Sequence, residues 1–218
     1  EFRRVLFRSL SLRLKAVADL VRRDSYLADI GCDHGFLPVY LLQCGKIKGA
    51  VASDINKGPL ERCRALVEQY DLSAQIQCVL SDGLSKIRFS ELQDIAVCGM
   101  GGELIASILE QCPYSKTPGV HYIFNPMTHP EKLRAYLCNN GYEIGSDLIV
   151  RDGNHAYSVL DAYYTGAKKD YPPAYYFLGN IRDFSDKNYF KSLLHYLKNK
   201  QKGGADYTQV IQEIEARL

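Results

Sequence analysis

Five short apolar runs alternate with amphipathic stretches between residues 27 and 140, and this alternation constrains the fold more than any other feature of the chain. The apolar runs predict strands at 27–31, 50–54, 76–80, 95–98 and 122–125. The stretches between them predict helices over 36–44, 58–70, 102–112 and 130–140. Because strands that alternate with helices form a parallel sheet with helices on both faces, we expect an α/β domain.

The end of this domain departs from the alternation. Two β-rich runs follow the fifth strand within 142–165, joined by the sequence RDGN, whose Asp-Gly pair is a hairpin signal. An antiparallel pair that closes five parallel strands resembles the ending of class I methyltransferases, whereas a dinucleotide dehydrogenase usually continues with another βα unit. The predicted fold is therefore a Rossmann-like class I methyltransferase sheet over residues 10–166.

A helical segment is predicted after this domain, over 167–218. A Pro- and Tyr-rich break near 168–180 leads into two runs with apolar residues at helical spacing, and Gly203 and Gly204 separate them. Asp206 is a candidate cap for the second helix. The pattern predicts a small helical hairpin, either a packing device for the core domain or an arm that docks a substrate.

The charge of the chain is informative only locally. Residues 1–9 carry three Arg and one Glu, net +2, which equals the net charge of the whole chain, so residues 10–218 sum to zero. Residues 168–202 carry eight Lys or Arg and three Asp, net +5. This stretch suits either a polyanionic partner or an ordinary solvated face.

Residues 1–9 read EFRRVLFRS, which matches the translation of a common sequencing-adapter read, and we interpret them as an artefact of sequence assembly rather than a signal peptide. No window holds 18 unbroken apolar residues, so no membrane span is expected. Seven Cys without a C-x-x-C pair indicate reduced thiols in the cytoplasm rather than zinc ligands or disulfides.

The turn after the first predicted strand reads ADIGCDHGFLP, at 28–38, where a sheet of this kind binds its ligand. It lacks the G-x-G-x-x-G spacing of a dinucleotide loop. The carboxylate of Asp33 would repel a pyrophosphate but not a sulfonium or an amino group. The loop therefore favours S-adenosylmethionine over NAD, with Asp29, Gly31 and Cys32 as cofactor-binding residues.

Residues after the next three strands complete the predicted cofactor site. Asp54 is placed to bind the ribose hydroxyls, and Asp82 to accept from the adenine amino group, with Gly83 giving room for the ring. Gly99 and Met100 belong to the turn CGMGGEL at 98–104. The alternative is that these are ordinary strand-end acids and a simple strand–helix turn.

Six segments in this order and spacing resemble the TrmK family. They are LSLRLKAVADLV at 10–21, ADIGCDHGFLP, ASDINKGPL at 52–60, SDGL at 81–84, CGMGGELIASIL at 98–109 and NPMTHPEKLRAYL at 125–137. Members of this family are bacterial tRNA (adenine-22-N1)-methyltransferases that use S-adenosylmethionine and carry a C-terminal helical pair. The resemblance implies that activity and a tRNA partner for this chain.

Adenine N1 has a free lone pair, so the expected chemistry is positioning for direct attack on the sulfonium methyl. Asp33 is the candidate catalytic residue, stabilising the charge on the methylated base or taking its N6 proton, or else it caps the helix at 36–44. His34 is the second catalytic candidate, which orients Asp33 or contacts the substrate, or else it is structural. Asn125 and Pro126 are candidates to shape the base pocket, and no metal is expected.

Two other functions remain open from the sequence. One is a methyltransferase of the same fold that acts on a small molecule or a protein. The other is an RNA-binding module that retains the fold without catalysis. The sequence leaves the oligomeric state unknown, with a monomer favoured.

Overall fold

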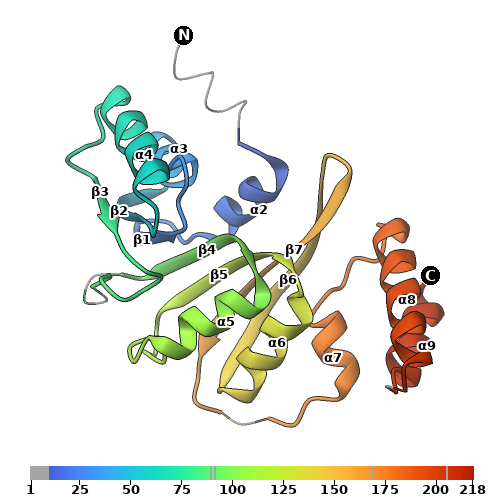
Figure 1. The fold of residues 1–218 in the computed structure, drawn as a ribbon. Helices are drawn as coiled ribbons and strands as arrows, with labels where there is room; N and C mark the ends of the chain where they lie inside the picture. Colours follow the sequence, from blue (N-terminus) through green and yellow to red (C-terminus); the bar gives the residue numbers. More distant parts are fainter. Residues whose placement is uncertain (1–9, 89, 91, 168, 205) are drawn as a thin grey trace.

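A computed structural model describes residues 10–88, 90, 92–167, 169–204 and 206–218 (Figure 1). The interpretation of residues 1–9 as an artefact lies outside these residues. The described chain begins with α2, Leu12–Leu20, which starts where the Ser11 side chain accepts a hydrogen bond from the Leu14 amide. Sequence analysis did not anticipate this helix.

A seven-stranded sheet forms the centre of the molecule, in the order β3-β2-β1-β4-β5-β7-β6 (Figure 1). Its strands are β1 Ser25–Ile30, β2 Ile47–Asp54, β3 Ile76–Leu80, β4 Asp94–Gly101, β5 His121–Thr128, β6 Tyr142–Asp152 and β7 His155–Tyr164. The first five are parallel, and β7 runs antiparallel to both β5 and β6. The predicted fold class is confirmed. The strand order reverses between β1 and β4, where sheets of this type open a crevice for a ligand.

Helices cover both faces of the sheet because its strands alternate their apolar side chains. The four helices are α3 Phe36–Gln43, α4 Lys57–Gln69, α5 Gly102–Gln111 and α6 Pro130–Asn139, each within one residue of its predicted bounds. On β5, Tyr122 and Phe124 point to the core under α5 and α6, whereas Ile123 points to the core under α2, α3 and α4.

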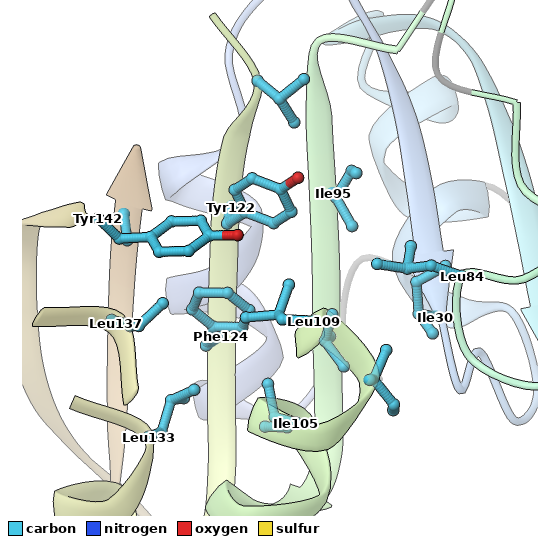
Figure 2. Close-up of a cluster of buried hydrophobic side chains, with 14 of the residues drawn as sticks. Ile30, Leu84, Ile95, Ile105, Leu109, Tyr122, Phe124, Leu133, Leu137 and Tyr142 are labelled. Carbon is cyan, nitrogen blue, oxygen red and sulfur yellow. The ribbon is translucent and has the colours of Figure 1, made fainter. Parts of the chain in front are cut away.

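The core under α5 and α6 is aromatic and contains two buried phenols (Figure 2). The Tyr122 and Tyr142 rings meet edge to face, with centroids 5.8 Å apart. Both hydroxyls donate to the backbone oxygen of Ser115, at 2.7 and 2.8 Å. Their polar ends are therefore satisfied, and the rings contribute apolar area without a buried unpaired group.

A charged cluster lies at the amino ends of β4 and β5, whereas the crevice lies at the carboxyl ends of the strands. His121 at the start of β5 contacts Asp94 Oδ1 through Nδ1 and Asp161 Oδ2 through Nε2, each at 2.8 Å. Arg22 donates from Nε to the same Asp94 oxygen at 2.8 Å, and the Tyr163 ring stacks on the imidazole. Burial lowers the pKa of His121, but the two carboxylates outweigh it and raise the pKa overall.

The C-terminal segment contains three helices, α7 Pro173–Leu178, α8 Lys187–Lys202 and α9 Thr208–Arg217. The last two confirm the predicted hairpin. The predicted break over 168–180 is wrong in part, because Pro173 occupies the first turn of α7, where proline has no N–H to lose. Asp206 does accept from the Thr208 amide, at 2.9 Å, although Tyr207 is the residue that precedes the helix.

A buried ion pair fastens α7 to the main domain. Arg134 of α6 donates to Asp147 of β6 through Nε at 2.7 Å and Nη2 at 2.9 Å, and its Nη1 donates to the backbone oxygens of Tyr176 and Phe177. Both charged side chains are fully buried. In turn Leu178 and its neighbour Ala174 pack against α8 and α9, so α7 joins the two parts. No helix of the described residues is long and apolar enough to cross a membrane.

Candidate functional site

A cavity of about 660 Å³ opens at the carboxyl ends of β1, β2 and β4. Its walls include all the residues predicted for the cofactor and for catalysis: Asp29, Gly31, Cys32, Asp33, His34, Asp54, Asp82, Gly83, Gly99 and Met100. The turns after four parallel strands therefore meet at one edge of the sheet, as the topology requires.

The floor of the cavity is the turn after β1. The amides of Gly31 and Cys32 both donate to the backbone oxygen of Ser53, at 2.8 and 2.9 Å, which ties this turn to the end of β2. Gly31 has φ +74, and a Cβ there would lie 2.3 Å from Met100 Cε. The positive φ favours glycine here, and a larger residue would also have to displace the flexible Met100 side chain.

Asp54, at the end of β2, presents a fixed carboxylate to the cavity. Its Oδ1 accepts from the Asn56 amide at 2.8 Å and its Oδ2 from the Asp33 amide at 3.3 Å. Each oxygen still has a lone pair for a ligand hydroxyl. Asp54 is thus oriented before any ligand arrives.

Asp29 is the deepest acid of the site. It is buried at the end of β1. Burial, together with the neighbouring charge of Asp54, raises the pKa of the Asp29 carboxyl to about 7. Near neutral pH the site therefore holds a proton that a cationic ligand would displace.

The Asp33 carboxylate is bound by two basic side chains and does not cap α3, the helix that follows it. Its Oδ2 lies 2.9 Å from His34 Nδ1 and its Oδ1 lies 3.3 Å from Arg62 Nη2. Burial would raise the pKa of Asp33, but these two partners lower it overall. The residue before α3 is Gly35, without a side-chain cap, so the alternative of Asp33 as a helix cap is wrong.

The cavity mouth has an apolar rim that sequence analysis did not identify. The rings of His34 and Phe36 stack with centroids 5.2 Å apart and planes 7° apart. Phe36, Ile55 and Leu104 are 37%, 59% and 54% exposed, and all three line the cavity. Exposed apolar side chains gathered at a cavity mouth favour a ligand with a flat, apolar surface.

Asn125 and Pro126, predicted for the base pocket, are not among the cavity-lining residues. Strand β5 continues to Thr128, so Asn125 lies inside the strand, paired with Cys98 of β4. The Asn125 amide donates to the Ser158 backbone oxygen at 3.0 Å and accepts from Arg13 Nη1 at 3.0 Å. It reaches the cavity only through that arginine.

Arg13 is the functional candidate that sequence analysis missed. It lines the cavity from α2. A signal was present, because Arg13 stands four residues before the buried Val17 and so occupies the inward face of the helix. The other charged residues of the cavity are Asp29, Asp33, Asp54 and Asp82, with His34 as the one further basic group among the described lining residues.

Three thiols lie beneath the cofactor loop. Cys32 lines the cavity, and the Cys63 and Cys78 sulfurs lie 3.7 Å apart. A hydrogen bond with Cys32 raises the pKa of Cys63 to about 12, and one with Cys63 raises the pKa of Cys78, so these thiols stay protonated. All seven cysteines are free, and no cluster able to hold a metal occurs in the part of the chain that the structure describes.

Comparison with known proteins gives a consistent picture. Residues 10–160 match a family model described as a methyltransferase domain. The chain is 35% identical over 153 residues to the tRNA (adenine(22)-N(1))-methyltransferase of Bacillus subtilis, a match that covers 70% of this chain and 64% of that protein's length.

Solved structures agree over a greater length. The B. subtilis M1A22 tRNA methyltransferase TrmK superposes with a TM-score of 0.79 at 29% identity, covering 96% of this chain and 95% of that one. The M. capricolum TrmK, solved with S-adenosylhomocysteine, superposes with a TM-score of 0.77 at 28% identity, covering 95% and 94%.

Proposed function

This chain belongs to the methyltransferase-domain family, and from that premise we propose that it transfers the methyl group of S-adenosylmethionine to N1 of an adenine in tRNA, at position 22 as its relatives' names state. The observation that carries the proposal is the acid-lined cavity of about 660 Å³ at the switch in strand order. The resemblance to the TrmK family extends over both the domain and the helical segment.

The residues of the cavity fit this cofactor. Buried Asp29 suits the cationic amino group, and Asp54, with both oxygens already oriented, suits the two ribose hydroxyls. Asp82 lies beyond β3, where the adenine amino group would be a donor. A Cβ at Gly99 would meet no atom within 4 Å, so the turn after β4 leaves open space for a bound group.

S-adenosylmethionine, when bound, supplies an electrophilic methyl group. The chain's own part is to place adenine N1 in line with that methyl and to stabilise the positive charge that the base acquires. Asp33 suits the second role, because its lowered pKa keeps it ionised at neutral pH. The same shift makes it a weak acceptor for the N6 proton.

The rim suits a base that has left its helix. N1 lies on the pairing edge of adenine, so the base must be unpaired or extruded to react. The exposed face of the His34–Phe36 stack offers a platform for such a base, a contact worth about 1–3 kcal/mol in other nucleic-acid complexes. Asn125 acts on this site indirectly, by holding Arg13.

The helical segment is the proposed docking arm for the tRNA body. Its charged side chains include Lys191, Lys200 and Lys202, which are exposed on α8. A basic helix apart from the acidic cavity would separate backbone binding from chemistry. We place the enzyme in the cytoplasm and propose that it acts as a monomer.

The test uses residues 10–218 with labelled S-adenosylmethionine and two transcripts of one bacterial tRNA, which carry adenosine or guanosine at position 22. After digestion to nucleosides, label in 1-methyladenosine from the first transcript alone is expected. Label that appears only in protein or small molecules contradicts the proposal. Label that appears equally with both transcripts contradicts the assigned position.

A further inference from the structure

Arg13 is the one Arg or Lys among the described residues that line the cavity, opposite four aspartates. This imbalance matters because both proposed ligands carry an oxyanion. The cofactor ends in a carboxylate, and the target nucleotide carries a phosphate. The ionised aspartates repel either group, so an anion that enters this cavity needs Arg13 as its partner.

The contacts of Arg13 compensate its charge only weakly. Its Nη1 donates to the neutral amide oxygen of Asn125 at 3.0 Å. Its Nε lies 3.6 Å from Asp152 Oδ2, beyond hydrogen-bond distance, and both side chains are 24% exposed. A partly exposed pair at this separation is weak and screened by salt. A guanidinium has five N–H donors, so several remain for a ligand.

Two other arginines show what a structural role looks like in this molecule. Arg134 makes a two-pronged ion pair with Asp147, bonds two backbone oxygens and is completely buried. Arg22 bonds Asp94 and the backbone oxygen of Gln93. Each has a carboxylate within hydrogen-bond distance. Arg13 instead has a neutral acceptor and faces the cavity.

The orientation of the Asn125 side chain is fixed by its own hydrogen bond, and it in turn holds the Arg13 guanidinium in place. The buried Asn125 donates from Nδ2 to the Ser158 oxygen, so its amide oxygen is turned toward the guanidinium. On the other side the Tyr157 ring lies 6.0 Å from the Arg13 Cζ atom. An arginine held by an amide and an aromatic ring keeps its geometry without losing its charge.

We propose that Arg13 binds an oxyanion in this cavity, either the carboxylate of the cofactor's amino-acid end or the phosphate of the target nucleotide. The inference rests on the proposed function for the identity of the two sources. It assigns Asn125 as the residue that positions Arg13. The shared chemistry is recognition of two anionic oxygens by a planar guanidinium fork.

The test compares Arg13→Gln and Arg13→Lys with Arg23→Gln, an exposed arginine just beyond α2 that removes the same charge outside the cavity. Calorimetry gives the Kd of S-adenosylhomocysteine and of adenosine, which lacks the carboxylate. Filter binding gives the Kd of tRNA as a function of salt. Thermal melting and circular dichroism check that each variant folds.

If the carboxylate is the ligand, Arg13→Gln weakens S-adenosylhomocysteine at least about tenfold and leaves adenosine unchanged. Arg13→Lys recovers part of the loss. If the phosphate is the ligand, S-adenosylhomocysteine is unaffected, tRNA binding weakens and the salt slope falls by about 1. Arg23→Gln changes neither the affinity for the small molecules nor the slope.

Two results overturn the inference. One is unchanged affinity of Arg13→Gln for both S-adenosylhomocysteine and tRNA. The other is equal weakening of adenosine and S-adenosylhomocysteine, which would make Arg13 a structural tie. Both results come from binding measurements, so they test the inference independently of methyl-transfer activity. A wild-type chain that binds these ligands without methylating tRNA would contradict the proposed function alone.

Discussion

Arg151 and Asp186 form a two-pronged ion pair, with Nε 2.9 Å from Oδ2 and Nη2 2.7 Å from Oδ1. The pair joins the end of the β6–β7 hairpin to the start of α8, where Asp186 also accepts from the Tyr189 amide as the cap of the helix. The next residue of the hairpin, Asp152, lies beside Arg13. The hairpin therefore touches the arm on one side and the cavity wall on the other.

We expect Arg151→Gln to raise the KM for tRNA about two- to fivefold and to leave the Kd of S-adenosylhomocysteine unchanged. The reason is that the arm loses its fixed position relative to the cavity, while the cofactor site stays intact. The control is Arg182→Gln, which removes an exposed charge elsewhere in the segment. Equal changes in both variants would show that only the lost positive charge matters. Steady-state kinetics at a fixed salt concentration gives the answer.

Cofactor binding should release a proton near pH 6.5. The pKa of Asp29 is about 7 without ligand, and a cationic amino group beside it favours the carboxylate. Affinity therefore rises with pH up to about 7 and falls by at most about tenfold per unit below it. Calorimetry in buffers of different ionisation enthalpy counts the proton.

Asp29→Asn should abolish that proton release and weaken binding. Folding stability changes with pH in the opposite direction to cofactor affinity. A carboxyl whose pKa is raised by folding favours the folded state most at low pH. Its destabilising effect grows as pH rises from about 4 to about 7. Without ligand, Asp29→Asn should therefore melt at a higher temperature than the wild type at pH 8. Equal proton release by both proteins would show that another group titrates.

Replacing Asp33 by Asn should reduce kcat by more than about tenfold while the cofactor Kd is retained. Asn is the matched change because Asp33 has φ +49, a region that Asn tolerates better than Ala does. Asp71→Asn is a control of the same kind, since Asp71 is exposed, has φ +55 and lies at the far end of α4. An unchanged kcat in Asp33→Asn would remove Asp33 from the chemistry.

His121 should make stability decline at high pH. Its pKa is raised in the folded state, so its contribution is complete below about pH 6.5, the value in an unfolded chain, and is lost as pH rises through the raised value. The facing groups are Asp94, Asp161, Arg22 and the Tyr163 ring.

His121→Gln should lower the free energy of unfolding by about 3 kcal/mol at pH 6, and by less at pH 9. Two buried carboxylates lose the cation that they share, although Asp94 keeps Arg22 and Asp161 keeps the Ser146 amide. Urea unfolding between pH 6 and 9 measures both effects. His155→Gln, an exposed change at the start of β7, is the control. Parallel pH curves for His121→Gln and the wild type would contradict this assignment.

The cavity was largely predictable, because its acids and glycines are local features of strand ends. Their meeting at one edge follows from parallel topology alone. Asn125 and Pro126 lie outside the cavity lining because β5 runs to Thr128, three residues beyond the predicted end, and short apolar runs define strand ends poorly. Their role in a base pocket stays a prediction. Arg13 and His121 depend on contacts between segments distant in sequence, 112 residues apart for Arg13 and Asn125. The helical spacing to Val17 places Arg13 on the inward face of α2, but no local pattern encodes its contact with Asn125 or the contacts of His121.

The contacts of Arg134 with Asp147 and the α7 backbone limit how the helical segment can be removed or replaced. Gly179, which follows α7, has φ +53, and a Cβ on it would lie 2.0 Å from Asp147 Oδ2. A foreign arm grafted here would need a glycine at this position and two backbone oxygens aimed at the guanidinium. Cutting the chain before α7 would leave a buried salt bridge open to water on one side. The helical segment therefore cannot be exchanged alone between related proteins. A functional replacement would have to include Arg134 and Asp147 of the main domain as well.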